Sequence, residues 1–260
     1  MLQERAELGA RIAREAGEIL MRHYSRLEGY EHKGPLDLVT AADKESEAFL
    51  VRSILEAFPE DSVLAEEDGE QGGGNSGYLW IIDPLDGTTN FVHSHPQFSV
   101  SVALTRNGEG VFGAVNAPAR KELFLAARGK GATLNGKPIH VSQTDSLSQS
   151  LLASGFAYDR RERMDVLLSR LAKALLAARG FRREGAAAQD LCSVAAGRLD
   201  GFWEDNLNAW DVAAGAVILE EAGGRLSGFD GGTHDIFARN TVATNGRIHG
   251  ALLETLFSGP

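Results

Sequence analysis

The sequence predicts a mixed α+β or α/β fold, in which helices are layered around two β-sheets. In the first half, two amphipathic helix patterns are followed by several strand patterns, and in the second half helix and strand patterns alternate. Such patterns bury their apolar faces best when helices pack on sheets. The chain has 260 residues, enough for one large domain or two fused halves. We expect one domain over residues 1–260, with a helix pair and a mainly antiparallel sheet at about 1–145 and an alternating α/β half at about 146–260.

The predicted helix pair lies at the start of the chain. Apolar residues recur at three- and four-residue intervals and predict an amphipathic helix over about 3–27. Residues 31–38 contain a Gly-Pro pair and are expected to form a loop or hairpin. Thr40 can then cap a second helix, with Asp43 three residues later accepting hydrogen bonds from exposed N–H groups. That helix should end near Phe58, because a proline follows.

The first sheet is predicted from short apolar runs. The glycine-rich, polar segment 69–77 is expected to be a flexible connection. Residues 78–82 are an apolar run typical of a buried strand, which Pro84 should end. Alternating apolar residues predict a half-buried strand over 98–104. The remaining expected features of this sheet are strands at 110–116 and 122–127 and a hairpin turn at Asn135-Gly136.

The second half reads as alternating helices and strands. The expected helices cover about 163–179, 187–197, 211–222 and 247–257. The expected strands between and after them cover 181–183, 199–204, 225–227 and 241–244. The sequence has no internal repeat and no clear linker.

Composition excludes several classes of protein. With 43% hydrophobic and 24% charged residues, the chain is typical of a globular protein. Its net charge of −10 argues against nucleic acid or a membrane surface as direct partner, because both are polyanionic. The single cysteine, Cys192, excludes an internal disulfide and a cysteine metal cluster. With no signal peptide or long apolar run, we expect a cytoplasmic protein that would bind an anionic substrate through cations in its site.

Acidic residues occur at positions that are unusual for surface charges. Asp83 follows a buried strand directly, and Asp86 comes three residues later, before Gly87-Thr88-Thr89. A carboxylate at the end of a buried strand needs a partner, and two such groups repel unless a cation lies between them. Mg²⁺ prefers hard oxygen ligands of this kind. The same Asp-Pro pattern is also typical of a simple type I turn.

Further candidates have ordinary explanations as well. Glu66 and Glu67 follow an apolar run and could be surface residues. Asp211 opens an Ala- and Gly-rich helix and could be only a helix cap. The residues after Gly87 could begin a helical turn whose free N–H groups face a phosphate. The segment 185–187 likewise precedes a helix.

Taken together, these segments resemble the inositol monophosphatase family, within the lithium-sensitive metal-dependent phosphatases. The motifs occur in the family's order at 37–43 (DLVTAAD), 66–67 (EE), 80–91 (WIIDPLDGTTNF), 210–215 (WDVAAG) and 221–224 (EAGG). The stretch from Phe181 to Glu204 is similar to the family's bacterial branch.

This resemblance implies a fold, a cofactor and a set of ligands. The fold would be the layered αβαβα sandwich of the inositol monophosphatase and fructose-1,6-bisphosphatase type, forming a single catalytic domain. The cofactor would be Mg²⁺, with two to three ions in the site. One ion would be bound by Glu66, Asp83 and the backbone carbonyl of Leu85, and a second by Asp83, Asp86 and Asp211. A third, more weakly bound ion would be coordinated by Glu66 and water molecules.

The resemblance also assigns catalytic and substrate-binding roles. Thr88 and Asp43 would form a hydrogen-bonded pair that, with Glu66, orients and deprotonates the attacking water. Glu204 matches a position that binds substrate hydroxyl groups. The full set of implied substrate-binding residues is Asp86, Gly87, Thr88, Gly185, Ala186, Ala187, Glu204 and Asp211.

The implied activity is hydrolysis of a small phosphate monoester, with inositol-1-phosphate as the leading substrate. Alternative substrates are fructose-1,6-bisphosphate, histidinol phosphate and a 3′-phosphoadenosine nucleotide. A second phosphate group could be bound by Arg160, Arg161, Arg182 and Arg183, which could equally be solvated surface charges. Ala186 stands where relatives often have Ser or Thr, so the substrate is less determined than the chemistry. The family also implies a homodimer, and a bacterial relative suggests a role in a transcription complex.

Overall fold

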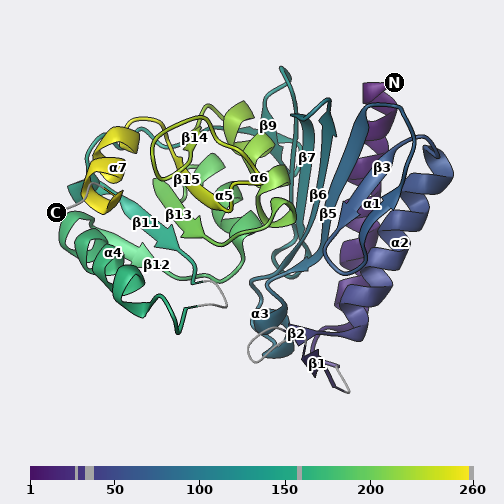
Figure 1. Ribbon diagram of the computed structural model, residues 1–260, viewed down its shortest axis with the longest axis horizontal. Coiled ribbons are helices and arrows are strands. Elements are labelled where there is room, and N and C mark those ends of the chain that lie inside the picture. Colours follow the sequence, from purple (N-terminus) through teal and green to yellow (C-terminus); the bar gives the residue numbers. More distant parts are fainter. Residues whose placement is uncertain (27–28, 33–37, 157–159, 258–260) are drawn as a thin grey trace.

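The computed structural model describes residues 1–26, 29–32, 38–156 and 160–257 and has alternating layers of helix and sheet (Figure 1). An eight-stranded and a five-stranded sheet face each other across a central helix layer, and each sheet has helices on its outer face. The layers, from the N-terminal side, contain the helices α1 (Leu2–His23) and α2 (Ala41–Ala57), then α5 (Ala187–Ala195) and α6 (Ala209–Glu221), and finally α4 (Met164–Ala177) and α7 (His249–Phe257). This arrangement confirms the predicted layered α+β sandwich.

The larger sheet is formed by the first half of the chain and is mainly antiparallel. Only β3 and β5 pair in parallel within it. Its strands, in spatial order, are β10 (Lys137–Ile139), β9 (Ala132–Leu134), β8 (Glu122–Ala127), β7 (Glu109–Ala117), β6 (Ser99–Arg106), β5 (Tyr78–Asp86), β3 (Ser62–Ala65) and β4 (Gly69–Gly72). The predicted hairpin turn is confirmed, because Asn135 (φ 50°) and Gly136 (φ 76°) join β9 to β10 in the left-handed conformation such turns need.

The smaller sheet is formed by the second half of the chain. Strand β11 runs parallel to β12 and β13, whereas β15 is antiparallel to β13 and β14. In spatial order its strands are β12 (Gly180–Arg182), β11 (Leu151–Ser154), β13 (Gly201–Asp205), β15 (Asn240–Thr244) and β14 (Arg225–Ser227). All four helices and four strands predicted for this half are present within a few residues of their expected bounds. The strand β11 was not predicted.

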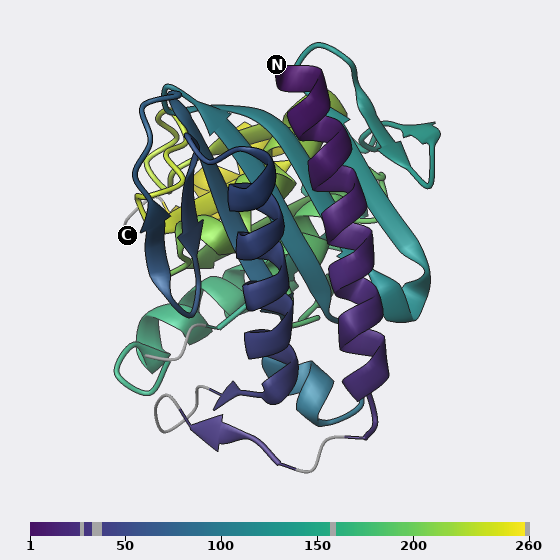
Figure 2. The same cartoon turned by 90° about the vertical axis from the view of Figure 1, so that its right-hand side faces the viewer.

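The N-terminal helices confirm the expected pair with one correction. Helix α1 ends at His23 rather than near residue 27, because Tyr24 leaves the helical conformation (ψ 128°) and Ser25 is left-handed (φ 62°). The cap of α2 is as predicted. The Thr40 hydroxyl accepts the N–H of Ala42, and the Asp43 carboxylate accepts the N–H of Thr40 at 2.8 Å. Figure 2 shows the two helices side by side across the outer face of the larger sheet.

Two predictions around the larger sheet were wrong. Residues 69–72 of the expected flexible connection form the edge strand β4, antiparallel to β3. An edge strand can be polar because only one of its sides is paired, and its composition then resembles that of a loop. Strand β5 also continues past Pro84 to Asp86 instead of ending there. The pairing with β6 shifts between Asp83 and Asp86, and this bulge accommodates the missing proline N–H.

Several short elements connect the larger helices and strands. The strands β1 (Glu31–His32) and β2 (Leu38–Val39) pair antiparallel, in agreement with the expected loop or hairpin. Residues 33–37, including Asp37 of the first motif, lie outside the described residues. The remaining short elements are α3 (Thr88–Val92) and two 3₁₀ turns at Pro118–Arg120 and Leu147–Gln149.

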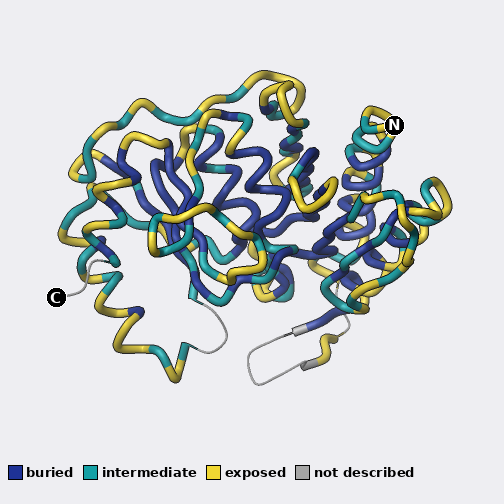
Figure 3. The backbone as a smooth tube through the Cα atoms, turned by 45° about the horizontal axis from the view of Figure 1, so that its top comes forward, coloured by how far each residue is buried: buried dark blue, intermediate teal, exposed yellow. Residues whose placement is uncertain are grey.

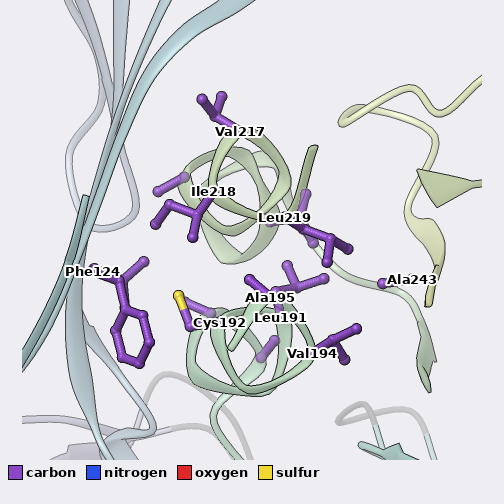
Figure 4. Packing of buried hydrophobic residues seen from close by; sticks show 14 of the residues in the cluster. Phe124, Leu191, Cys192, Val194, Ala195, Val217, Ile218, Leu219 and Ala243 are labelled. Atoms are coloured by element: carbon purple, nitrogen blue, oxygen red, sulfur yellow. The ribbon is translucent and has the colours of Figure 1, made fainter. Parts of the chain in front are cut away.

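The central layer is the most deeply buried part of the molecule (Figure 3). Helices α5 and α6 pack against each other and against both sheets, so nearly all of α6 from Val212 to Leu219 is buried. Cys192 lies in this core beside Phe124 and Ile218 (Figure 4), where its buried side chain fills space between the helices and the larger sheet. Burial raises the pKa of its thiol. Among the described residues, no helix combines the length and the apolar character needed to cross a bilayer.

Candidate active site

Two carboxylates lie at the bulged end of strand β5. Asp83 and Asp86 are both buried, where β5 pairs with β6. Asp83 accepts the N–H of Leu85 at 2.9 Å, and Asp86 accepts the hydroxyl of Ser99 at 3.2 Å. The bulge therefore holds both side chains inside the protein rather than in a simple exposed turn.

Two further predicted carboxylates join them from distant segments. Glu66, in the connection between β3 and β4, is hydrogen-bonded to Asp83. Burial raises the pKa of Asp83 well above its usual value, and the charges of Glu66, Asp86 and Asp211 raise it further. Burial likewise raises the pKa of Asp86 to about 7, although hydrogen bonds from Ala188 and Ser99 oppose this. The structure thus brings together all four predicted acidic ligands, whose like charges disfavour one another.

The donor chemistry of this cluster fits a magnesium site. Among the described residues, no group of three His, Cys, Asp or Glu side chains is arranged closely enough to hold a metal ion without some movement. The cluster nevertheless offers only carboxylate and backbone oxygens, which are the ligands that Mg²⁺ prefers. A cation among these four carboxylates, of which Asp83 and Asp86 are buried, would offset the repulsion between their charges.

The predicted pair of Thr88 and Asp43 is present beside the cluster. The Thr88 hydroxyl lies 3.2 Å from Asp43 Oδ1 and 3.1 Å from the carbonyl oxygen of Leu85. Asp43 is fully buried in the first turn of α2. Gly87 supplies the turn before Thr88 in a left-handed conformation (φ 90°), where a Cβ would come within 2.9 Å of the Gln97 carbonyl oxygen. The turn therefore requires glycine for both conformation and space.

The segment 185–187 reaches the same region from the second half of the chain. The N–H groups of Ala187 and Ala188, at the start of α5, donate to the Asp86 carboxylate at 3.1 and 3.0 Å. Gly185 and Ala186 lie against Gly87, within 3.4 Å of where its Cβ would be. Because the Ala187 N–H already binds Asp86, only the remaining backbone of this segment can face a ligand.

Asp211 was predicted to be either a helix cap or a member of the acidic cluster, and its surroundings fit both roles. It is in the first turn of α6, where its carboxylate accepts the N–H of Asn208 at 2.6 Å, as a helix cap does. Its charge also raises the pKa values of Asp83 and Glu204. One side chain therefore caps a helix and contributes to the acidic cluster.

Glu204 lies on β13 in a space that Gly155 leaves open. A Cβ at Gly155 would be 1.9 Å from Oε2 of Glu204. Burial raises the pKa of Glu204 well above its usual value, and the charges of Asp190 and Asp211 add to this while Arg183 opposes it. Arg183, one of the four predicted arginines, is exposed, and its charge lowers the pKa of Glu204.

Several residues of the site were missed by the sequence analysis. Asn90 donates through Nδ2 to the carbonyl oxygens of Gln97 (2.7 Å) and Glu184 (2.9 Å), and so holds the segment before Gly185 against α3. Its place in the motif after Thr88 was the only available signal. Asp190 is buried, and within the described part of the chain neither of its carboxylate oxygens has a hydrogen-bond partner. Nothing in its helical sequence indicated this.

Comparison with known proteins agrees with this architecture. The model of the inositol monophosphatase family matches residues 1–258. An inositol-1-monophosphatase of Synechocystis is 43% identical over 260 residues, covering 100% of this chain and 91% of the relative. A putative Nus factor SuhB of Neisseria meningitidis is 41% identical, covering 95% of each chain. The solved inositol monophosphatase of Anabaena superposes with a TM-score of 0.91 at 44% identity, covering 100% of this chain and 97% of the other.

These likenesses define the class of the protein as a phosphoric monoester hydrolase. More narrowly, the chain belongs to the inositol monophosphatase family. The family resemblance stated from the motifs is therefore confirmed.

Proposed function

We propose that this chain is a Mg²⁺-dependent phosphatase that hydrolyses inositol-1-phosphate. The observation that carries the proposal is the cluster of Glu66, Asp83, Asp86 and Asp211, in which Asp83 and Asp86 are buried, beside the Thr88–Asp43 pair. The cluster draws on both halves of the chain, which supports residues 1–260 acting as one catalytic domain.

The proposed ligands follow the donor set described above. Glu66, Asp83 and the Leu85 carbonyl would hold one Mg²⁺, and Asp83, Asp86 and Asp211 a second, with a weaker third beside Glu66. Bound ions would neutralise the phosphate dianion and lower the pKa of a water molecule. Without such cations, the four carboxylates of the site would repel the phosphate group.

The protein's own groups would position and deprotonate that water. Thr88 donates its hydroxyl hydrogen bond to Asp43, so the Thr88 oxygen keeps lone pairs that can accept a hydrogen bond from the water. Glu66 would accept one proton from that water as it attacks, the other proton would stay on the new phosphate, and the departing alkoxide would take up a proton in exchange for the one removed. The N–H groups of Gly87 and Thr88 would receive phosphate oxygens. These groups are fixed before substrate binds, which favours catalysis by orientation.

The substrate pocket would lie between Glu204 and the segment 185–187. Glu204 would bind ring hydroxyls, and the backbone of Gly185 to Ala187 would bound the cyclitol. Ala186 has no hydroxyl to offer, so selection among polyols falls mainly on Glu204.

A turnover panel tests the proposal. We expect Mg²⁺-dependent phosphate release to be fastest with inositol-1-phosphate, compared with fructose-1,6-bisphosphate, histidinol phosphate and 3′-phosphoadenosine 5′-phosphate. Release should stop on chelation and be inhibited by lithium. Activity that survives chelation, or preference for another ester, would contradict the metal or the substrate assignment respectively.

Gly155→Ala tests the role of Glu204 without altering its chemistry. The new methyl group would occupy the position of the Glu204 carboxylate, which must move away. We expect the KM for inositol-1-phosphate to rise about tenfold, equivalent to about 1.4 kcal/mol of lost binding. A phosphate ester that lacks hydroxyl groups, such as phenyl phosphate, should be affected much less.

Gly250→Ala is the matched control for that substitution. Gly250 is exposed in helix α7, and among the described residues nothing beyond the helix's own nearby backbone lies within 4 Å of where its Cβ would be. We expect kinetics identical to those of the parent protein. Equal changes in KM for both esters in Gly155→Ala would indicate a general distortion and contradict the specific role of Glu204.

A second candidate function is a role in a transcription complex, favoured by the relatives named as Nus factors. Capture of partner proteins from a bacterial extract, compared between the parent protein and Asp83→Asn, would separate this role from catalysis. Partners retained by the inactive variant would support a function that resides on the surface.

We also propose a homodimer. The outer face of α4 exposes several apolar side chains, among them Leu168, Leu175 and Leu176, the last of them 90% exposed. The neighbouring β12 is an edge strand of its sheet. Sedimentation velocity of the parent protein and of Leu175→Glu/Leu176→Glu would test whether this face is covered by a second copy.

A further inference from the structure

Helix α2 carries three buried polar side chains on one face. Ser46 and Glu47 lie three and four residues after Asp43, and the exposed fractions of Asp43, Ser46 and Glu47 are 0%, 0% and 2%. Residues at this spacing lie on the same side of a helix. Burying polar groups is unfavourable unless they are hydrogen-bonded. The partners of these side chains should therefore explain why the face is polar.

Each of the three binds a different segment of the proposed active site. Asp43 is paired with Thr88, the first residue of α3. The Ser46 hydroxyl donates to the carbonyl oxygen of Pro84, in the bulge between the two carboxylates of β5, at 3.0 Å. Glu47 binds the connection between β3 and β4, which contains Glu66. In Figure 2 the first turns of α2 lie beside α3.

Glu47 makes the most extensive of these contacts. Its Oε2 accepts the N–H of Glu67 at 2.9 Å, and its Oε1 accepts the N–H of Asp68 at 2.8 Å. Both oxygens of one carboxylate therefore hold two consecutive N–H groups. These are the two residues that directly follow Glu66, and they fix the backbone from which its side chain extends.

The electrostatic setting makes this contact unusual. The two residues whose N–H groups Glu47 binds, Glu67 and Asp68, are themselves acidic. Burial raises the pKa of Glu47, and the charges of Glu67 and Asp68 raise it further against the two N–H hydrogen bonds. A glutamine at position 47 would avoid this repulsion. It has only one side-chain oxygen, however, whereas the connection between β3 and β4 presents two N–H donors, those of Glu67 and Asp68.

We infer that Glu47 is a positioning residue that directs Glu66 toward Asp83. It touches neither substrate nor the reacting water, and acts through the backbone at 67–68. The inference rests on the proposed function, since the consequence of misplacing Glu66 is a slower chemical step. Helix α2 thereby ties three segments of the site to one rigid element.

Glu47→Gln tests the inference. Glutamine keeps the size of the side chain, but its amide group places an N–H₂ against one of the two N–H donors. At saturating Mg²⁺ we expect kcat for inositol-1-phosphate to fall about 10- to 100-fold, with KM changed less than about twofold, because a small misorientation of a catalytic group has effects of this size. In the absence of substrate, amide hydrogen exchange at 67–68 should become faster.

Glu45→Gln is the matched control on the same helix. Glu45 is an exposed carboxylate paired with Arg22 and His23, so its loss should change neither kcat nor exchange at 67–68. Glu47→Asp keeps the negative charge but shortens the side chain by one methylene group, so the carboxylate no longer reaches both N–H groups. This variant replaces Glu47→Gln in the experiment if the Gln variant does not fold. Failure of both variants to fold would assign Glu47 a purely structural role and overturn the inference.

The outcomes distinguish this inference from the proposed function. If the parent protein releases no phosphate from any ester, the proposed function is wrong. Independently of that result, the positioning role is wrong if amide hydrogen exchange at residues 67–68 is the same in Glu47→Gln as in the parent protein. If the parent protein is active and Glu47→Gln keeps its kcat, only the positioning role fails.

Discussion

Asp83→Asn is expected to lower Mg²⁺-dependent phosphate release by about 10³-fold or more while the protein stays folded. Asparagine keeps the shape of the side chain and the oxygen that accepts the Leu85 N–H. It removes the charge that lies among Glu66, Asp86 and Asp211 and that is proposed to bridge two cations. Losing about 4 kcal/mol of transition-state stabilisation corresponds to a decrease of this size.

The stability of the same variant distinguishes a functional from a structural role. In the parent protein, burial and three neighbouring carboxylates disfavour the charge of Asp83. A neutral amide removes that repulsion, so the midpoint of thermal unfolding without added Mg²⁺ should stay the same or rise. The stabilisation that Mg²⁺ gives the parent protein should be largely lost, since a ligand stabilises only the state that binds it.

Asp145→Asn provides the comparison for that experiment. Asp145 is exposed and far from the carboxylate cluster in sequence, and its replacement should change neither turnover nor the effect of Mg²⁺. Retention of more than about a tenth of the parent activity by Asp83→Asn would remove the basis for a bridging carboxylate.

The parts of the site that could be predicted lie at the ends of recognisable elements. Asp43 was placed by its helix cap, and Asp83 by the apolar strand before it. The local pattern fixed these positions on the chain. That the two segments lie together came from the family resemblance, because a strand end and a helix cap do not by themselves predict that they meet.

The parts that were missed depend on contacts between distant residues. Asn90 and the Glu184 carbonyl are 94 positions apart, and Glu47 is 20 and 21 positions from the N–H groups it binds. An asparagine or a glutamate on a helix has many ordinary explanations. Only the folded arrangement shows that its partner is a backbone group in another segment.

The errors in the strands have a different origin. The edge strand β4 is polar because one side of it faces solvent, so composition favoured a loop. Strand β5 passes through Pro84 because a bulge removes the need for its N–H. In both cases the pairing partner, rather than the local sequence, decides the conformation.

Asp61→Ala is expected to cause the largest loss of stability, about 3–5 kcal/mol in the free energy of unfolding. Asp61 is fully buried before β3 and accepts two hydrogen bonds from the Arg5 guanidinium, both at 2.7 Å, and one from the Trp80 indole at 2.9 Å. Alanine would leave the Arg5 charge and the Trp80 N–H without this acceptor. Denaturation by urea at pH 7 measures the loss.

The pH dependence of this difference follows from the pKa of Asp61. Burial raises that pKa, but hydrogen bonds from Arg5, Ser76 and Trp80 outweigh burial and lower it below the usual 3.8. The unfolded chain therefore takes up the proton first as pH falls. The contribution of Asp61 is complete above the unfolded pKa and is lost as pH falls through the lower folded value, so the two proteins should converge in stability under strongly acidic conditions.

Glu15→Ala shows what a surface ion pair contributes in the same helix region. The Arg11–Glu15 pair spans 3.4 Å with both side chains at least 40% exposed, and its loss should cost less than about 0.5 kcal/mol. Arg5, by contrast, also packs 4.1 Å from the ring centroids of both Phe58 and Tyr78, which holds its charge in place. If Asp61→Ala lost no more stability than Glu15→Ala, the stacking on Phe58 and Tyr78, rather than the carboxylate, would be what keeps Arg5 buried.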